Sequence, residues 1–425
     1  MAAVALIMGN MIGSGVFLLP ASLAPFGWNS VIAWALTIAG ALVLAAVLAR
    51  LTREVPQSGG ATSFVGTAFG KLAEFLIAWG YLISIPLGSA VLAISAVSYA
   101  SRLAPVFGAG AAAPMISALV LIAIITLVNF RGVRAAGGVQ IVTLLIKLVP
   151  LVLVVILAAR ALTTGEAQIA PFEPAAISGS KVAGAAALTL FAVLGFECAS
   201  IAAARVENPT VNVPRATMIG TALAGLLYLL VSSAITLLLP PATVAASPAP
   251  FATFVATFWD AGPAQFVALF AVVSCIGALN GWLMVGGEMT RDMAARGELP
   301  AWLAATDARG TPRRAILATA LATALFLLLN ASRSMQGIFD YLLLLSTSTA
   351  LWFYLGFAFA AIKLGVARML AAIGAIYSLW TLWGAGIEAS GLSVVLMVLG
   401  LPLWWWARRT RARGTQGIEG GLASL

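Results

Sequence analysis

Residues 9–20 read GNMIGSGVFLLP and residues 189–208 read TLFAVLGFECASIAAARVEN. Each stretch is apolar enough for a membrane helix, yet each is interrupted in its middle, the first by glycines around Ser14 and the second by Gly195 and Glu197. Glycine is a poor helix former, and free backbone at membrane depth is tolerated only where it lines a cavity or is buried in protein. The two interruptions therefore predict a pair of broken helices that face one binding site near the bilayer midplane.

The composition excludes a soluble domain. Of the 425 residues, 62% are hydrophobic and 9% are charged, with a mean hydropathy of +1.06, whereas soluble domains average about 25% charged residues. Apolar runs of twenty or more residues alternate with short polar connections, which is typical of an all-α polytopic membrane protein and unlike the alternating pattern of a β-barrel.

The rare residue types exclude whole classes of chemistry. The chain has no histidine and two cysteines, which removes histidine general bases, histidine-ligated metals and cysteine-rich metal sites. Cys198 and Cys275 lie in apolar segments and read as packing residues. We therefore expect no catalytic residue, no metal and no other cofactor. The net charge of +9 indicates cytoplasmic loops rich in lysine and arginine rather than a surface that binds nucleic acid.

Counting about 20 apolar residues per span predicts twelve transmembrane helices. Their approximate bounds are 2–26, 31–51, 72–100, 113–130, 137–159, 182–204, 216–239, 251–290, 315–331, 337–362, 367–387 and 391–407. The segment 251–290 is too long for one simple span, so we expect an extracellular approach, a span and a cytoplasmic extension.

The distribution of lysine and arginine predicts the orientation. With the N-terminus inside, eighteen of the 23 basic residues fall in cytoplasmic loops and four in outside loops, leaving Lys147 within a span. This bias places both termini in the cytoplasm, with the protein in the cytoplasmic (inner) membrane. The first span follows Met1 directly, from which we expect a longer natural start. The Gly-rich tail 410–425 is expected to be disordered.

Four motifs in order carry a resemblance to a known family: GNMIGSGVFLLPASLAPFGW at 9–28, PQSGGATSFVGTAFG at 56–70, FAVLGFECASIAAARVENPTVNVPRAT at 191–217 and GEMTRDMAARGELP at 287–300. Together they resemble the amino acid–polyamine–organocation transporters. The resemblance implies an inverted repeat of five plus five helices with helices one and six broken. The repeats would be 1–160 and 180–363, followed by two additional C-terminal helices within 366–409.

The same resemblance implies a pocket between the broken helices. The substrate carboxylate would meet backbone N–H groups around Gly13 and Gly15 and the hydroxyl of Ser14, in a segment unwound over 12–15. The substrate ammonium would meet backbone carbonyls at Ile12 and near Ala192 and Leu194. This division follows the helix dipoles and needs no ionised side chain in the pocket, so we expect neutral amino acids to be accepted at least as well as arginine.

Further side chains are candidates to line this pocket. Phe191 stands where arginine/agmatine exchangers of the family have a tryptophan that stacks on the guanidinium, and Trp282 matches a gating tryptophan of the same members. Each could equally be a packing aromatic or, for tryptophan, an interfacial anchor. Polar candidates on helices three and ten are Ser84, Ser89, Ser346 and Thr347.

Two ionisable residues within spans are candidates for coupling or gating. Intramembrane charges are costly and tend to be functional. Glu197 is expected to link transport to protons or to gate the pocket, or else to tie helices together as a neutral, hydrogen-bonded acid. The stretch VQIVTLLIKL at 139–148 resembles helix five of sodium-independent family members, so Lys147 would replace the sodium ion and tie helix five to the region of Gly9 and Ser14.

These observations predict a sodium-independent secondary transporter of amino acids that works by alternating access, as an exchanger. A proton-coupled symporter or exporter of amino acids or polyamines is the alternative. A membrane-embedded transferase would need clustered acids or histidines, and a channel would need a filter or selectivity ring. The expected partners are a small-molecule amino acid and the lipid bilayer, and a homodimer is left open.

Overall fold

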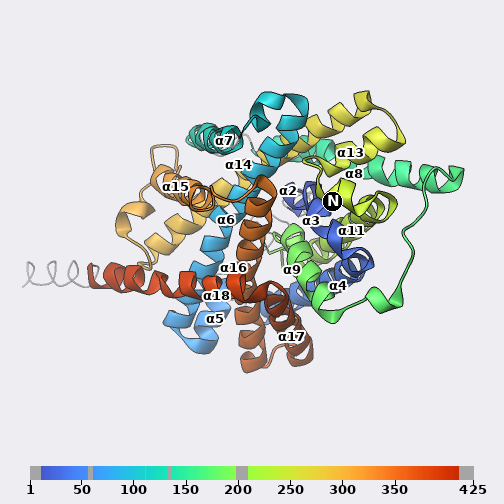
Figure 1. Ribbon diagram of the computed structural model, residues 1–425. Coiled ribbons are helices and arrows are strands. Elements are labelled where there is room, and N and C mark those ends of the chain that lie inside the picture. The colour runs from blue at the N-terminus through green and yellow to red at the C-terminus, as the bar shows by residue number, and fades with distance from the viewer. Residues whose placement is uncertain (1–10, 56–60, 111, 132–135, 198–208, 411–425) are drawn as a thin grey trace, which may run out of the picture.

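The computed structural model describes residues 11–55, 61–110, 112–131, 136–197 and 209–410, and within these ranges the chain is helical with no strand. Figure 1 shows the arrangement of the helices. The long elements are α4 (Trp28–Glu54), α6 (Lys71–Leu103), α7 (Ala113–Asn129), α8 (Ala136–Thr164), α9 (Gly179–Val193), α11 (Pro209–Leu238), α14 (Ala261–Ala295), α15 (Arg313–Leu329), α16 (Met335–Leu364), α17 (Arg368–Gly384) and α18 (Gly386–Val398).

Shorter elements connect these helices. They are α2 (Ser14–Phe17), α3 (Leu19–Leu23), α5 (Ala61–Phe69), α12 (Pro241–Ala245), α13 (Pro250–Phe258) and the 3₁₀ turns η1 (Ala24–Phe26), η2 (Pro105–Gly108), η4 (Pro174–Ala176) and η6 (Ala301–Ala304).

Seven helices in the described ranges are long and apolar enough to cross a membrane. They are α4, α6, α8 from Ile146, α11 from Pro214, α14, α16 and the C-terminal segment Gly386–Thr410 that begins with α18. All seven fall on predicted spans. Helices α7 and α9 are apolar but shorter, and α15 and α17, with 17 residues each, also coincide with predicted spans. The chain therefore has the architecture of a polytopic membrane protein.

Two helices form the centre of the molecule. Helices α6 and α16 pack against each other and lie inside a ring of other helices (Figure 1). In the most apolar 18-residue stretch of each helix, 78% of the residues are buried, compared with 17% in the segment Gly386–Thr410. Both are rich in Gly, Ala, Ser and Thr, small residues that let helix backbones approach closely in a membrane. Any site between them is therefore held by the most deeply buried part of the bundle.

The first predicted break is present but shorter than predicted. Ile12 and Gly13 lie outside helical geometry, whereas Ser14 and Gly15 already belong to α2. The predicted unwinding over 12–15 is therefore wrong for its second half. A further turn at Leu18 separates α2 from α3, and the Tyr99 hydroxyl of α6 donates to the Phe17 carbonyl over 2.7 Å, which satisfies a carbonyl that this turn exposes.

The second break follows α9. The helix stops at Val193, and Leu194 to Glu197 form a turn in which Gly195 has φ +110°. This conformation suits glycine, so Gly195 explains why the helix ends here, well before the predicted end of the span at residue 204. Residues 198–208, with Cys198, lie outside the described residues, as do Gly9 and the tail beyond Thr410.

The long predicted segment 251–290 divides into two helices. Helix α13 ends at Phe258 and α14 begins at Ala261. Asp260 separates them because its carboxylate caps α14 by accepting a hydrogen bond from the Gly262 N–H over 3.1 Å. Helix α14 has 35 residues, about 52 Å at 1.5 Å per residue, so it extends beyond the roughly 30 Å of hydrocarbon.

Candidate substrate site

A cavity of about 40 Å³ lies where the two breaks meet α6, α14 and α16. Many of the residues predicted for the site line it: Gly13, Gly15, Ser84, Phe191, Ala192, Leu194, Glu197, Trp282 and Ser346. They come from parts of the chain that are far apart in sequence. Met11 and four α6 residues that were not predicted, Tyr81, Ile85, Gly88 and Leu92, complete the lining.

Other predicted residues do not line this cavity. Ile12 is buried beside it, and Ser89 is buried with a hydroxyl that has no partner among the described residues. Thr347 donates to the Leu343 carbonyl of its own helix over 2.9 Å. Ser89 and Thr347 directly follow lining residues, and adjacent helical positions point about 100° apart. The side chain of Ser14 lies outside what the structure describes.

Lys147 is also away from the cavity. It is 3% exposed on α8 and lies close enough to the Cys275 thiol of α14 to interact with it electrostatically. The predicted tie to the region of Gly9 and Ser14 concerns residues outside the described side chains. What the structure adds is that Lys147 is buried within the bundle rather than extended toward the membrane surface.

Glu197 is the most highly connected group at the site. Its side chain is 2% exposed. One carboxylate oxygen accepts a hydrogen bond from the Tyr81 hydroxyl of α6, the other accepts one from the Tyr354 hydroxyl of α16 over 2.9 Å, and both receive the Gly195 N–H at 3.2 Å. The turn after α9 is thus fastened to both central helices through one carboxylate.

Glu197 lines the cavity, so an acidic side chain lies where the predicted recognition through backbone groups needs no ionised one. The sequence places Glu197 only two residues beyond Gly195, and the turn at Gly195 folds its side chain back toward the break. An ionised carboxylate offers about four acceptor sites. The two tyrosines and the Gly195 N–H hold this carboxylate at the wall of the cavity, where it makes this corner acidic.

Sequence reasoning missed the two tyrosines. Tyr81 and Tyr354 are among six tyrosines in the chain, and both lie in the middle of apolar spans. A buried tyrosine hydroxyl usually finds a partner, so a rare buried acid and rare mid-span tyrosines are natural partners. Phe196 stacks on the Tyr354 ring at 5.3 Å and 14°, and Phe353 packs on Tyr81 at 4.6 Å, which fixes both rings.

Helices α6 and α16 are tied together beside the cavity. The Ser346 hydroxyl donates to the Ser84 carbonyl over 2.9 Å, and the Ser84 hydroxyl donates to the Tyr81 carbonyl over 2.6 Å. Gly88 leaves room between them: a Cβ there would lie 3.3 Å from Ser346 Oγ and 3.4 Å from Phe191 Cε2. Phe191 therefore occupies space that any larger residue at position 88 would compete for.

Gly15 brings the two breaks into backbone contact. A Cβ on Gly15 would lie 2.8 Å from the Ala192 Cα and 3.1 Å from Phe191 Cδ1. Gly15 therefore also allows close helix packing, as small residues do at helix interfaces in membranes. Gly13 is similar but looser, with a Cβ 3.1 Å from Ala278 Cβ of α14.

A second polar cluster joins α3 to α16, away from the cavity. The Ser22 hydroxyl donates to Asp340 over 2.5 Å, and the Gln336 amide donates to both Ser22 and Asp340 at 3.0 Å. Asp340 lies six residues before Ser346 on α16, about 9 Å along the helix axis. This cluster fastens the segment after the first break to the same central helix that holds Glu197.

The cavity is small in this conformation. At roughly 10–15 Å³ for each water position, 40 Å³ has room for about three waters. A substrate with a large side chain would require the surrounding segments to move apart. In the described part of the chain there is no group of three or more His, Cys, Asp or Glu residues placed to hold a metal.

Comparisons with known proteins agree with this architecture. A family model for amino acid permeases matches residues 1–407. A cadaverine/lysine antiporter of Escherichia coli is 29% identical over 434 residues, covering 98% of this chain and 96% of the relative. Putrescine transporters PotE of Haemophilus influenzae and Escherichia coli are each 29% identical, covering 94% of this chain and 94% and 93% of their own lengths.

Proposed function

The chain belongs to the amino acid permease family, and from that premise we propose that it is a sodium-independent exchanger that moves amino acids across the cytoplasmic membrane by alternating access. The family and the relatives are transporters rather than enzymes, and the chain is an integral membrane protein. The observation that carries the proposal is the cavity between two helix breaks, lined by Gly13, Phe191 and Glu197.

In this proposal the backbone around Gly13 and Gly15 meets the substrate carboxylate, and the open carbonyls at the end of α9 meet its ammonium. A helix C-terminus carries partial negative charge, and the turn at Leu194 leaves backbone carbonyls beside the cavity. Phe191 offers a ring face to an apolar or cationic side chain, and Trp282, half-buried on α14, gates the cavity.

Alternating access requires the broken segments to move relative to α6 and α16. The hydrogen bonds that resist this motion are those of Glu197 with Tyr81 and Tyr354 on one side, and those of Asp340 with Ser22 on the other. The proposed fold has twelve helices, with inverted repeats at 1–160 and 180–363 and two further helices within 366–409. Both termini lie in the cytoplasm in this proposal. In such a fold, segments one and six rock around a fixed midplane site.

A second candidate function is exchange of an amino acid for a diamine. It is favoured because the acidic side chain of Glu197 lines the cavity, and because the relatives are named for cadaverine, lysine and putrescine. A diamine lacks the carboxylate that Gly13 and Gly15 would hold, so Glu197 would carry the recognition of one ammonium group. Coupling to protons through Glu197 is the remaining alternative to exchange.

Uptake of radiolabelled compounds into proteoliposomes distinguishes these functions. Vesicles preloaded with lysine, arginine, leucine, alanine, cadaverine or putrescine are tested for uptake of each labelled compound, with α-amides of the amino acids as competitors. If the protein is an amino acid exchanger, it should take up amino acids, and the amides should inhibit this uptake only weakly because an amide lacks the charged carboxylate. Strong competition by amides together with preferred uptake of diamines would favour the second function, and uptake of none of these compounds would contradict both.

A further inference from the structure

A second, larger cavity lies on the other side of α6. It has a volume of about 390 Å³ and is bounded by α6, η6, α15 and the C-terminal segment Gly386–Thr410. Its lining is almost entirely apolar, with Leu82 and Pro86 on α6, Ala322 on α15 and Leu403 near the C-terminus. The proposed transport function makes no use of this groove.

The groove opens onto the surface that meets lipid. Leu82 and Ile83 at its floor are buried, whereas Trp302 and Leu399 at its rim are 53% and 59% exposed. Next to the rim, Leu321 of α15 is 61% exposed. In a membrane-spanning chain an exposed apolar surface of this kind is covered by acyl chains, so the groove is accessible from the bilayer.

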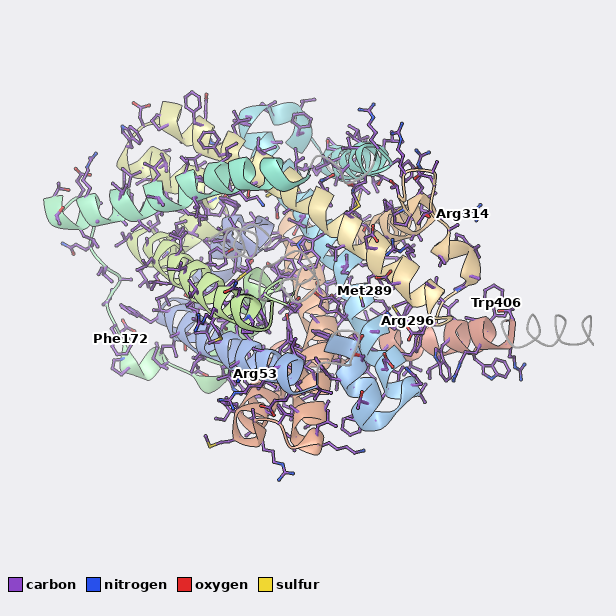
Figure 2. All side chains as sticks on the ribbon, turned by 180° about the vertical axis from the view of Figure 1, so that it is seen from behind. Arg53, Phe172, Met289, Arg296, Arg314 and Trp406 are labelled. Carbon is purple, nitrogen blue, oxygen red and sulfur yellow. The ribbon has the colours of Figure 1, made fainter. Side chains whose placement is uncertain are left out.

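A neighbouring cavity of about 360 Å³ is lined by residues that adjoin arginines in the sequence. The two cavities share Leu299, and small residues at the end of α14 and near the C-terminus line the second one, among them Ala295, Ala407 and Thr410. Arginines are interspersed with these lining residues in the sequence, at positions 296, 408 and 409. Figure 2 shows Arg296, Arg314 and Trp406 on one side of the molecule, opposite Phe172.

Most of these arginines lack an acidic partner within the described residues. Arg296 pairs with Glu298 at 3.0 Å, but Arg314, Arg408 and Arg409 have no ion pair with any carboxylate that the structure describes. Arg314 donates to the Trp302 carbonyl at 3.4 Å, which places its guanidinium at the rim of the apolar groove. The guanidiniums of Arg408 and Arg409 lie over tryptophan rings, at 4.6 Å and 3.2 Å.

We propose that this composite groove is a binding site for one anionic phospholipid of the bilayer, with an acyl chain in the apolar cavity and the phosphate against Arg314, Arg408 and Arg409. Apolar burial accounts for the chain, and arginine suits phosphate because its planar fork donates two parallel hydrogen bonds. The charge at the rim distinguishes this occupant from a second copy of the chain, since two copies would bring like charges together.

The bound lipid contacts the wall of the substrate cavity. Tyr81, Ser84 and Ile85 of α6 line the substrate cavity, while Leu82, Ile83 and Pro86 line the groove. Thr319 of the groove and Ile85 of the substrate cavity both pack against Gly286 of α14. A Cβ on Gly286 would lie 2.6 Å from the Thr319 methyl group and 2.9 Å from that of Ile85. This second step rests on the proposed function: occupancy of the groove positions α6 and thereby alters the transport rate.

Native mass spectrometry of the purified full-length protein, equilibrated with phosphatidylglycerol or phosphatidylcholine, tests the binding step without any transport assay. The unchanged protein should retain one phosphatidylglycerol in preference to phosphatidylcholine. Ala322→Trp, which fills the groove, should lower retention of both lipids by about tenfold, equivalent to displacing about two acyl methylenes. Leu321→Trp, one position away on the lipid-facing side of α15, is the matched control and should leave retention unchanged.

The arginines are tested separately. Arg314→Gln, Arg408→Gln and Arg409→Gln should each lower phosphatidylglycerol retention by about fivefold without affecting phosphatidylcholine, while Arg368→Gln at the start of α17 should have no effect. Equal retention of phosphatidylglycerol by all variants would overturn the proposal. So would the finding that the unchanged protein is a dimer and that Ala322→Trp makes it a monomer without loss of bound lipid. If the variants lose their preference for phosphatidylglycerol while the transport rate is the same in vesicles with and without this lipid, that result would overturn only the coupling of the groove to α6.

Discussion

The hydroxyl of Tyr354 donates a 2.9 Å hydrogen bond to a carboxylate oxygen of Glu197, 157 residues earlier in the chain. This contact joins the centre of α16 to the turn that ends α9. Since Tyr81 of α6 donates to the other oxygen, movement of the break away from either central helix must disturb the same carboxylate. Glu197 therefore links the geometry of the substrate cavity to the packing of the bundle.

Removal of one of these hydroxyls should impair transport. We expect Tyr354→Phe to lower the initial rate of exchange by tenfold or more, because a hydrogen bond to a charged group contributes about 1.5–3 kcal/mol. Tyr228→Phe is a matched control, since the Tyr228 hydroxyl of α11 is buried without a partner among the described residues. Equal rates for the two variants, with equal Tm values, would show that the Glu197 cluster is dispensable.

A methyl group at position 88 should discriminate against large substrates. Gly88→Ala places a Cβ 3.3 Å from Ser346 and 3.4 Å from Phe191, so it narrows the space beside the Phe191 ring at a cavity of 40 Å³. We expect KM to rise severalfold for substrates with long side chains and little for alanine. Gly277→Ala on α14 meets nothing within 4 Å and should leave KM unchanged. A uniform fall in kcat without a change in KM would contradict this role.

Gly15→Ala should destabilise the protein rather than remove a ligand contact alone. The new Cβ would overlap the Ala192 Cα at 2.8 Å, and overpacking of this kind costs about 1–3 kcal/mol. We expect a lower Tm together with a loss of exchange, and a smaller effect for Gly13→Ala. An unchanged Tm for Gly15→Ala would mean that the close contact between α2 and α9 yields without cost.

The membrane helices and their breaks could be predicted from the sequence because both depend on local features. Apolar runs predicted the spans, and the glycines at 13 and 195 marked the two breaks to within a few residues. The hydrogen-bond partners could not be predicted: Tyr81 and Tyr354 meet Glu197 only after three distant segments pack together. Choosing Ser89 over its neighbour Gly88 failed for a related reason, since the face of α6 that meets the cavity depends on how the helix is rotated in the bundle.

The role of Lys147 stays a prediction, although its burial on α8 is consistent with a function inside the bundle. A buried ammonium that stands in for a cation would make sodium unnecessary. Lys147→Ala should then reduce exchange strongly in a variant that still folds and inserts. Lys147→Arg, which keeps the charge but not the shape, should retain part of the activity.

The central claim is sodium-independent exchange through the cavity between the breaks, and counterflow in proteoliposomes tests it most directly. Uptake of the best labelled substrate is measured into vesicles that are either empty or preloaded with the same unlabelled substrate, with and without a sodium gradient. Fast uptake only into preloaded vesicles, equal in the presence and absence of sodium, is the predicted result. Uptake that is equally fast into empty vesicles, or that a sodium gradient stimulates, would contradict the account.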